Sequence, residues 1–92
     1  MKSILQKEKE CFFCEKTTEL EEHHIYAGVA NRPISEKNGF KVWLCHRHHT
    51  GSNQSVHLNR KMDFTLKCCC QSKFEETHSR AEFMKLIGKS YL

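Results

Sequence analysis

The sequence predicts a small α+β domain stabilised by zinc, and three observations lead to this prediction. The chain has 92 residues, of which 6 are cysteines and 7 are histidines. A domain of this length buries only about 60–65% of its unfolded surface, and small domains often need a metal, disulfides or a partner. The apolar pattern also changes along the chain, from strand-like before residue 45 to helical after residue 58.

The first half of the chain is predicted to contain an arm, two strands and a loop. Residues 1–10 are charged and weakly apolar, so we expect a loose arm. Residues 17–26 can form a strand. Residues 27–38 contain a glycine and the only proline, which favours a loop. Residues 40–45 are rich in aromatic and β-branched side chains, which predicts a second strand.

The second half is predicted to be helical after a polar break at residues 50–55. Apolar side chains recur at spacings of three and four over residues 57–76, which predicts an amphipathic helix. Ser79 and Glu82 have the spacing of a capping box, in which each side chain accepts a hydrogen bond from the backbone amide of the other. We therefore expect a last helix over about residues 80–87, with a glycine following it.

The cysteine spacing favours a metal site over disulfides. Cys11 and Cys14 form a Cys-x-x-Cys pair, and Cys45 and His48 form a Cys-x-x-His pair. Two such pairs separated by a long insert are typical of a four-ligand zinc site, because a tight turn directs both donor atoms of a pair at one centre. The chain start lacks a signal-peptide pattern, so we expect a reducing compartment that disfavours disulfides. For the first pair alone, two buried thiols or a redox pair are the alternatives.

Four further histidines are expected to gather around the predicted strands. His23 and His24 end the first strand, where adjacent side chains point to opposite faces. His49 follows the last zinc ligand, and His57 begins the long helix. Together the strands and the zinc should bring these imidazoles to a second site. The remaining cysteines and histidines receive no metal or catalytic role, and we expect core or surface positions for them: Cys68, Cys69, Cys70, His46 and His78.

These motifs resemble the HNH endonucleases, whose ββα-metal core places two strands and a helix around one divalent ion. The resemblance rests on Cys11-x-x-Cys14, on the Glu-His-His-Ile run at 22–25 and on the Trp-Leu-Cys-His-Arg-His-His run at 43–49. It covers residues 11–60 of a single domain, 1–92, in which residues 61–92 add C-terminal helices. The end of the chain is similar to small phage-encoded proteins of this type and to phage RecA-dependent recombination nucleases.

The resemblance implies a role for each histidine. His24 matches the general base that activates the attacking water, a task suited to an imidazole with a pKa near about 6.5. His23 and His49 match ligands of a catalytic divalent ion, which can be magnesium, manganese, nickel or zinc. His57 is implied as a further ligand, although eight residues separate it from His49.

The family also has a middle asparagine that orients the general base. Asn38 is the nearest match in this chain, about two positions early, since Phe40 occupies the usual place. Asn31 is the alternative. The identity of this orienting residue is therefore left open by the sequence.

The charge distribution predicts DNA as the partner. The formal net charge is +4; residues 1–46 carry seven basic and seven acidic side chains, and residues 47–92 carry eight against four. A basic half beside a metal site suits a phosphate backbone. The expected contacts are Arg47, Arg60, Lys61 and Lys67. Nothing indicates base-specific readout, so we expect weak sequence preference, and the resemblance adds a recombinase–DNA filament as a further partner.

The sequence therefore favours a metal-dependent HNH-type endonuclease acting on DNA. We expect a cytoplasmic protein; the resemblance implies phage origin, in which case the compartment is the cytoplasm of the bacterial host. No apolar run reaches the roughly 18–20 residues of a membrane span, so no membrane partner is expected. The main alternative is a non-catalytic zinc-binding nucleic-acid module, which leaves the four extra histidines without a shared purpose. A zinc domain that binds proteins is a second alternative, and DNA affinity at low salt distinguishes it.

Overall fold

Two antiparallel strands, β1 (Leu20–His24) and β2 (Lys41–Cys45), form the centre of the computed structural model, which describes residues 1–92. The register pairs His23 with Val42 and His24 with Lys41. Because side chains alternate along a strand, His23 shares the face of the buried Val42, whereas His24 lies on the opposite face with Lys41. The side chains of the two adjacent histidines therefore lie in different environments on opposite faces of β1, as the sequence predicted.

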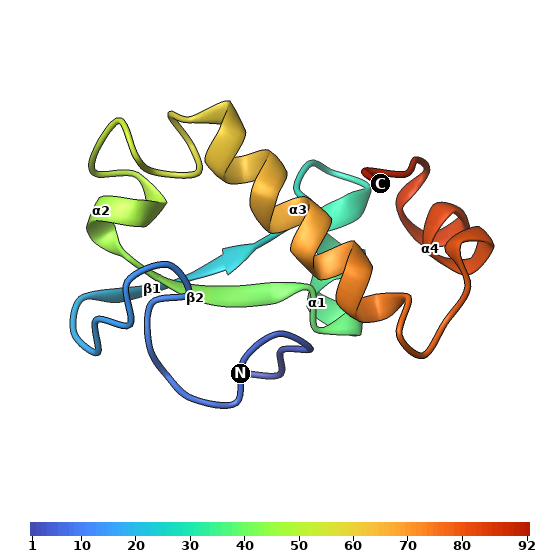
Figure 1. The fold of residues 1–92 in the computed structure, drawn as a ribbon, viewed down its shortest axis with the longest axis horizontal. Helices are drawn as coiled ribbons and strands as arrows, with labels where there is room; N and C mark the ends of the chain where they lie inside the picture. Colours follow the sequence, from blue (N-terminus) through green and yellow to red (C-terminus); the bar gives the residue numbers. More distant parts are fainter.

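Four helices complete the fold (Figure 1). They are α1 (Asn31–Asn38), α2 (His46–His49), α3 (Arg60–Phe74) and α4 (Arg80–Ile87). In Figure 1, α2 continues directly from β2, α3 passes over the hairpin, and α4 lies at the far end of the molecule. The small α+β class is confirmed. None of these helices has the length and apolar character that crossing a membrane requires.

The prediction of a loop over residues 27–38 is wrong, because this segment contains α1. Pro33 is the third residue of α1. Its missing N–H costs nothing there, since amides in the first helical turn have no intrahelical acceptor. Gly39 ends the helix in the left-handed conformation, with φ of 74° and its amide donating to the Ser35 carbonyl. The first strand is also shorter than predicted, since Glu19 has a positive φ of 55° directly before it.

The two C-terminal helices are confirmed, but the long one is shorter than predicted at both ends, so His57 precedes α3 instead of beginning it. α3 starts at Arg60 because the side chain of Asn59 caps it, with Oδ1 accepting from the amides of Lys61 at 3.0 Å and Met62 at 3.2 Å. The capping box of α4 is present in both directions, with 3.1 Å from the Glu82 amide to Ser79 Oγ and 3.0 Å for the reciprocal bond.

The expectation of a loose arm over residues 1–10 is wrong. The segment is irregular but is bonded along β2 and the turn before it. The Ile4 amide donates to the Gly39 carbonyl at 2.9 Å, the Ser3 hydroxyl donates to the Lys41 carbonyl, and the Trp43 amide donates to Gln6 Oε1 at 2.7 Å. These bonds occupy backbone groups of an edge strand that would otherwise remain unpaired.

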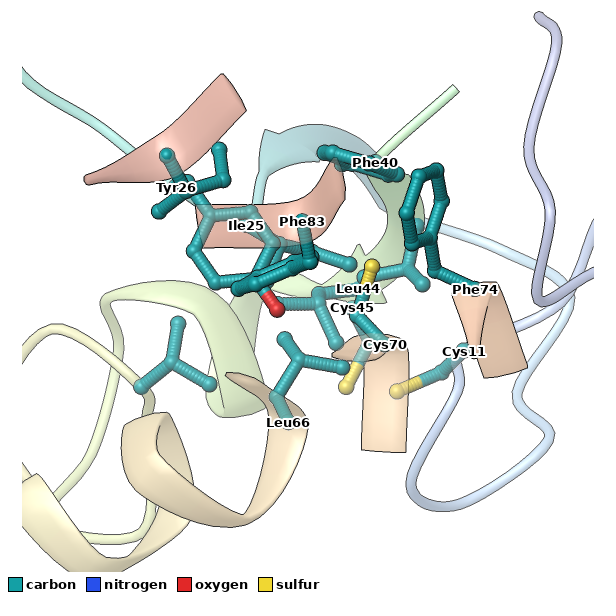
Figure 2. Close-up of a cluster of buried hydrophobic side chains, with 13 residues drawn as sticks. Cys11, Ile25, Tyr26, Phe40, Leu44, Cys45, Leu66, Cys70, Phe74 and Phe83 are labelled. Atoms are coloured by element: carbon teal, nitrogen blue, oxygen red, sulfur yellow. The ribbon is translucent and has the colours of Figure 1, made fainter. Parts of the chain in front are cut away.

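The core joins β2, α3 and α4 with the segments between them, and aromatic rings are prominent in it (Figure 2). Tyr26 and Phe83 meet with ring centroids 5.3 Å apart, and Phe40 and Phe74 meet at 5.5 Å, both pairs edge to face. Two of the predicted zinc ligands, Cys11 and Cys45, belong to the same buried cluster. A metal at these cysteines would therefore tie the N-terminal turn to the core.

Candidate metal centres

The first cluster is made by Cys11, Cys14, Cys45 and His48, whose ligand atoms all lie within 4.8 Å of one another. Cys14 Sγ and Cys45 Sγ are 3.7 Å apart, and His48 Nδ1 lies 3.6 Å from Cys11 Sγ and 3.3 Å from Cys45 Sγ. Zinc bonds of about 2.3 Å to sulfur and 2.0–2.1 Å to nitrogen give tetrahedral edges of about 3.4–3.8 Å. The cluster can hold a metal ion such as zinc, as predicted.

Local backbone bonds create this arrangement. The Cys11 amide donates to the Lys16 carbonyl at 2.8 Å, and the Glu15 amide donates to the Cys11 carbonyl at 2.9 Å, closing the first turn. Glu15 takes a left-handed φ of 63°. The Phe12 amide then donates to the Trp43 carbonyl at 2.9 Å, which docks the turn on β2 beside Cys45.

The pKa shifts of two ligands, Cys11 and His48, suit a metal. Burial acts to raise the pKa of the Cys11 thiol, but hydrogen bonds from the backbone at Cys45, Cys14 and Phe13 outweigh it, and the pKa lies below its usual value. Burial, followed by the charge of Arg47, lowers the pKa of His48. A thiolate and a neutral imidazole are the forms that bind zinc. For Cys14, the backbone hydrogen bond at Lys16 acts to lower the pKa, but burial and the neighbouring thiols of Cys11 and Cys45 outweigh it, and the pKa is instead raised.

The second cluster contains His23, His49 and His57, whose ligand atoms also lie within 4.8 Å of one another. His49 Nε2 and His57 Nε2 are 3.1 Å apart, and the ring centroids of the three imidazoles are 4.7–5.3 Å apart. Two nitrogens bound to one ion at about 2.0–2.1 Å would have a separation of about 2.8–3.4 Å, depending on the angle at the ion. The three histidines can therefore share an ion.

His57 reaches this cluster because residues 50–57 fold back onto α2. The Val56 amide donates to the His48 carbonyl at 2.8 Å, and the His57 amide donates to the His49 carbonyl at 3.3 Å. The residues between His49 and His57 thus form a closed loop, which brings these two side chains together.

His23 provides the sharpest sign that this cluster is a binding site. Its Nε2 atom is buried and has no hydrogen-bond partner. An unpartnered buried polar atom is rare and needs an explanation, such as a bound ion. Burial lowers the pKa of His23 to about 3, with the charges of His49 and His57 acting in the same direction. The ring is therefore neutral and offers a lone pair.

Glu21 supports the second cluster and was missed by the sequence reasoning. Its Oε1 lies 2.7 Å from His49 Nδ1. A carboxylate only accepts at this distance, so Nδ1 carries the proton and Nε2 of His49 presents its lone pair to the cluster. The hydrogen bond from His49 lowers the pKa of Glu21. The available signal was the strand period, since Glu21 and His23 are two residues apart on one face.

His24 lies on the other face of β1, with Nε2 at 3.0 Å from Glu36 Oε1. Lys41 joins this group through Glu36 and through Glu22 at 3.2 Å. The pKa of Glu36 lies below its usual value, chiefly because of the hydrogen bond from Lys41 and then that from His24. The carboxylate thus stays charged, and it fixes the proton of His24 on Nε2.

A hollow of about 240 Å³ lies at the end of β1, and residues from both faces of the strand line it. His24 lines it together with all three histidines of the second cluster, and Arg32 of α1 also contributes. The complete lining is Glu22, His23, His24, Ala27, Arg32, His49 and His57.

Neither candidate for the orienting asparagine forms a hydrogen bond with His24. The Asn38 amide donates to the Ile34 carbonyl at 2.9 Å, within its own helix. The Asn31 amide donates to the Ile87 carbonyl at 3.3 Å, tying α1 to α4. The orienting role of Asn38 stays a prediction, and the hydrogen-bond partner of His24 is Glu36, which the sequence reasoning missed. Glu36 lies 12 residues from His24 in sequence, and only the unexpected helix α1 brings it there.

The residues predicted to contact DNA lie at two separate sites on the surface. Arg60, Lys61 and Lys67 line one groove of about 480 Å³, together with Lys89 near the chain end. Arg47 lies on α2, where its guanidinium donates to Gln54 Oε1 at 2.8 Å. The unassigned residues lie as expected: Cys70 is fully buried in the core, Cys68 and Cys69 are half-buried, and His46 and His78 are exposed.

Comparison of the chain with known protein families, with curated proteins and with solved structures gives no match. The interpretation of both clusters rests on the motifs of the sequence and on the geometry described above.

Proposed function

We propose that this chain is a metal-dependent HNH-type endonuclease that hydrolyses phosphodiester bonds in DNA with weak sequence preference, and that it is phage-encoded. The observation that carries the proposal is the hollow at the end of β1. It is lined by a candidate general base, His24, and by three histidines able to share an ion. A purely structural zinc module needs only the first cluster.

The first cluster would have a structural role. Its three cysteines and one histidine form a closed set of four ligands, which leaves no position for substrate. Zinc there would hold the N-terminal turn and the start of α2 on β2. His49, which follows His48 directly, is positioned by the same constraint.

The second cluster would hold the catalytic ion through His23, His49 and His57. A divalent ion at such a site stabilises negative charge on a phosphate oxygen and on the leaving oxygen. Imidazole donors suit zinc, nickel and other transition metals, whereas magnesium prefers oxygen ligands. We therefore expect nickel to support cleavage better than magnesium.

His24 would accept the proton of the attacking water. With Nε2–H donated to Glu36, Nδ1 is the nitrogen left free to do so. Glu36 would hold the ring in this tautomer and stabilise the imidazolium once it forms, as a carboxylate beside a histidine base does. Arg32 supplies a positive charge on the wall of the hollow, where a phosphate would enter.

The test is plasmid nicking by the zinc-loaded chain with added manganese, nickel or magnesium. We expect His24→Ala to reduce nicking at least about 100-fold, within the range for loss of a general base. His78→Ala is the matched control, since His78 is exposed and stacks on Phe74 with ring centroids 4.2 Å apart, outside the hollow. Undiminished nicking by folded His24→Ala protein would contradict the role of His24.

Metal stoichiometry separates this proposal from a non-catalytic zinc module that binds nucleic acid. The endonuclease should bind one zinc and a second divalent ion, and His49→Ala should lose only the second. Binding of a single zinc, with no nicking under any added metal, would favour the non-catalytic module.

A further inference from the structure

A groove between α3 and the chain end combines basic and aromatic side chains. We refer to it as the α3–tail groove. Its volume is about 480 Å³, and its cations are Arg60, Lys61, Lys67 and Lys89, with the rings of Phe64 and Tyr91 between them. Asp63 is the one acidic residue of the lining, and it pairs with Lys67 at 2.8 Å. The other three cations have no carboxylate partner, which leaves the groove strongly positive.

Phe64 is unusual within this surface. Its side chain is exposed, with 53% of the residue accessible to solvent, although it projects from the middle of a helix that packs on the core. Its ring centroid lies 6.3 Å from that of Tyr91, with 59° between the planes. The accessible part of the Phe64 ring is an apolar surface beside unpaired cations.

The tail wall of the groove is held in place before any ligand binds. The Tyr91 amide donates to Oε1 of the fully buried Gln71 at 2.7 Å. Cys68 Sγ donates to the Tyr91 carbonyl at 3.1 Å. Lys89 Nζ lies over the Tyr91 ring at 4.8 Å from its centroid. These contacts fix the ring and set a cation beside it, so little ordering is needed on binding.

The groove lies beside the histidine hollow. His57, which lines the hollow, precedes Arg60 of the groove by three residues in the chain. Tyr26 follows His24 by two residues in the chain, and its hydroxyl donates a hydrogen bond to the Lys67 carbonyl at 2.6 Å. These links place the groove close to the hollow, although the two share no lining residue.

From this arrangement we infer that the α3–tail groove binds single-stranded DNA, with a base stacked on Phe64 and phosphates on Arg60, Lys61 and Lys89. Duplex DNA keeps its base faces stacked inside, so an aromatic ring beside cations contributes little to binding it. A single strand offers both base faces and phosphates to such a groove. The inference rests on the proposed function for its link to cleavage, and it names the substrate class as DNA with a single-stranded segment beside the cut.

The test measures binding without cleavage, so that it stands apart from the nuclease proposal. Fluorescence anisotropy is recorded for the zinc-loaded chain without other divalent ions, using a labelled 15-nucleotide thymidine strand and a 15-base-pair duplex. We expect Phe64→Ala to weaken single-strand binding about tenfold, as loss of one stacked base does, with less than a twofold effect on the duplex. Phe64→Trp should retain the affinity.

Charge variants test the phosphate contacts. Lys89→Gln should weaken single-strand binding. It should also make the negative slope of log affinity against log salt shallower by about 0.7. Lys85→Gln and Met84→Ala are the matched controls, because both residues are on α4 and do not line the groove. All of these side chains are on the surface, and unchanged thermal melting verifies that each variant is folded.

Three results would overturn the inference. Equal single-strand affinity for Phe64→Ala and the unmodified chain would remove the stacking contact. Equal weakening of strand and duplex would indicate a general electrostatic surface. Binding of a uridine RNA strand without binding of the thymidine strand would assign the groove to RNA.

Discussion

The Nδ1 atom of His49 lies 2.7 Å from the Oε1 atom of Glu21, and this contact sets the direction in which His49 presents its other nitrogen. Glu21 is on β1, and His49 is the last residue of α2, the short helix that follows β2. The second cluster is therefore oriented by a carboxylate behind its ligands, an arrangement common at histidine metal sites.

Glu21→Ala should weaken binding of the second divalent ion about 10- to 100-fold, the usual effect of removing a carboxylate behind a metal-bound histidine. Zinc at the cysteine cluster should be retained. The measurement is a manganese or nickel titration by calorimetry. His46→Ala is the matched control, because His46 also contacts Glu21, at 3.3 Å, but is exposed and outside the cluster. Equal affinities for Glu21→Ala and the unmodified chain would rule out this role.

Glu36→Gln should reduce nicking by at least about tenfold with little change in KM, because the neutral amide cannot stabilise an imidazolium at His24. Asn38→Ala should stay within about twofold of the unmodified chain, since its amide bonds only to the Ile34 carbonyl. Steady-state nicking kinetics on the two variants measure this difference. The reverse order of effects would return the orienting role to the asparagine.

Cys45→Ala should abolish folding, because Cys45 is both a ligand of the first cluster and a core residue with 2% of its surface exposed. Structural zinc contributes roughly 10–16 kcal/mol in small zinc domains, which matches or exceeds the typical stability of a whole domain, about 5–15 kcal/mol. Cys69→Ala is the control and should keep one zinc. Circular dichroism and zinc content measure both, and a cooperative thermal transition in zinc-free Cys45→Ala would contradict the expectation.

Cys70 should resist alkylation in the folded protein. Burial raises the pKa of its thiol to about 12, above the ordinary value, so almost none is thiolate at pH 8. Iodoacetamide labelling with mass spectrometry should show Cys69 reacting well before Cys70. Since the thiol keeps its proton in the folded chain and loses it near pH 9 in the unfolded chain, its contribution to stability should decrease as pH rises above about 9. Equal labelling rates for the two cysteines would contradict this.

Features that are encoded within a few residues could be predicted from the sequence alone. Each half of the zinc cluster comes from a single turn, Cys11 to Cys14 and Cys45 to His48, and the four ligands were predicted from that spacing. The capping box at Ser79 and the apolar period of α3 are equally local. Such patterns can be recognised in a sequence because the backbone of a turn or helix fixes the relative positions of neighbouring side chains.

Which distant residues meet depends on how the whole chain packs. His57 joins His49 because the intervening loop closes on α2, and Glu36 reaches His24 because residues 31–38 form a helix rather than a loop. The N-terminal arm docks on β2, and the chain end forms one wall of the α3–tail groove. These contacts depend on packing and on hydrogen bonds between segments far apart in the chain, which no local pattern records.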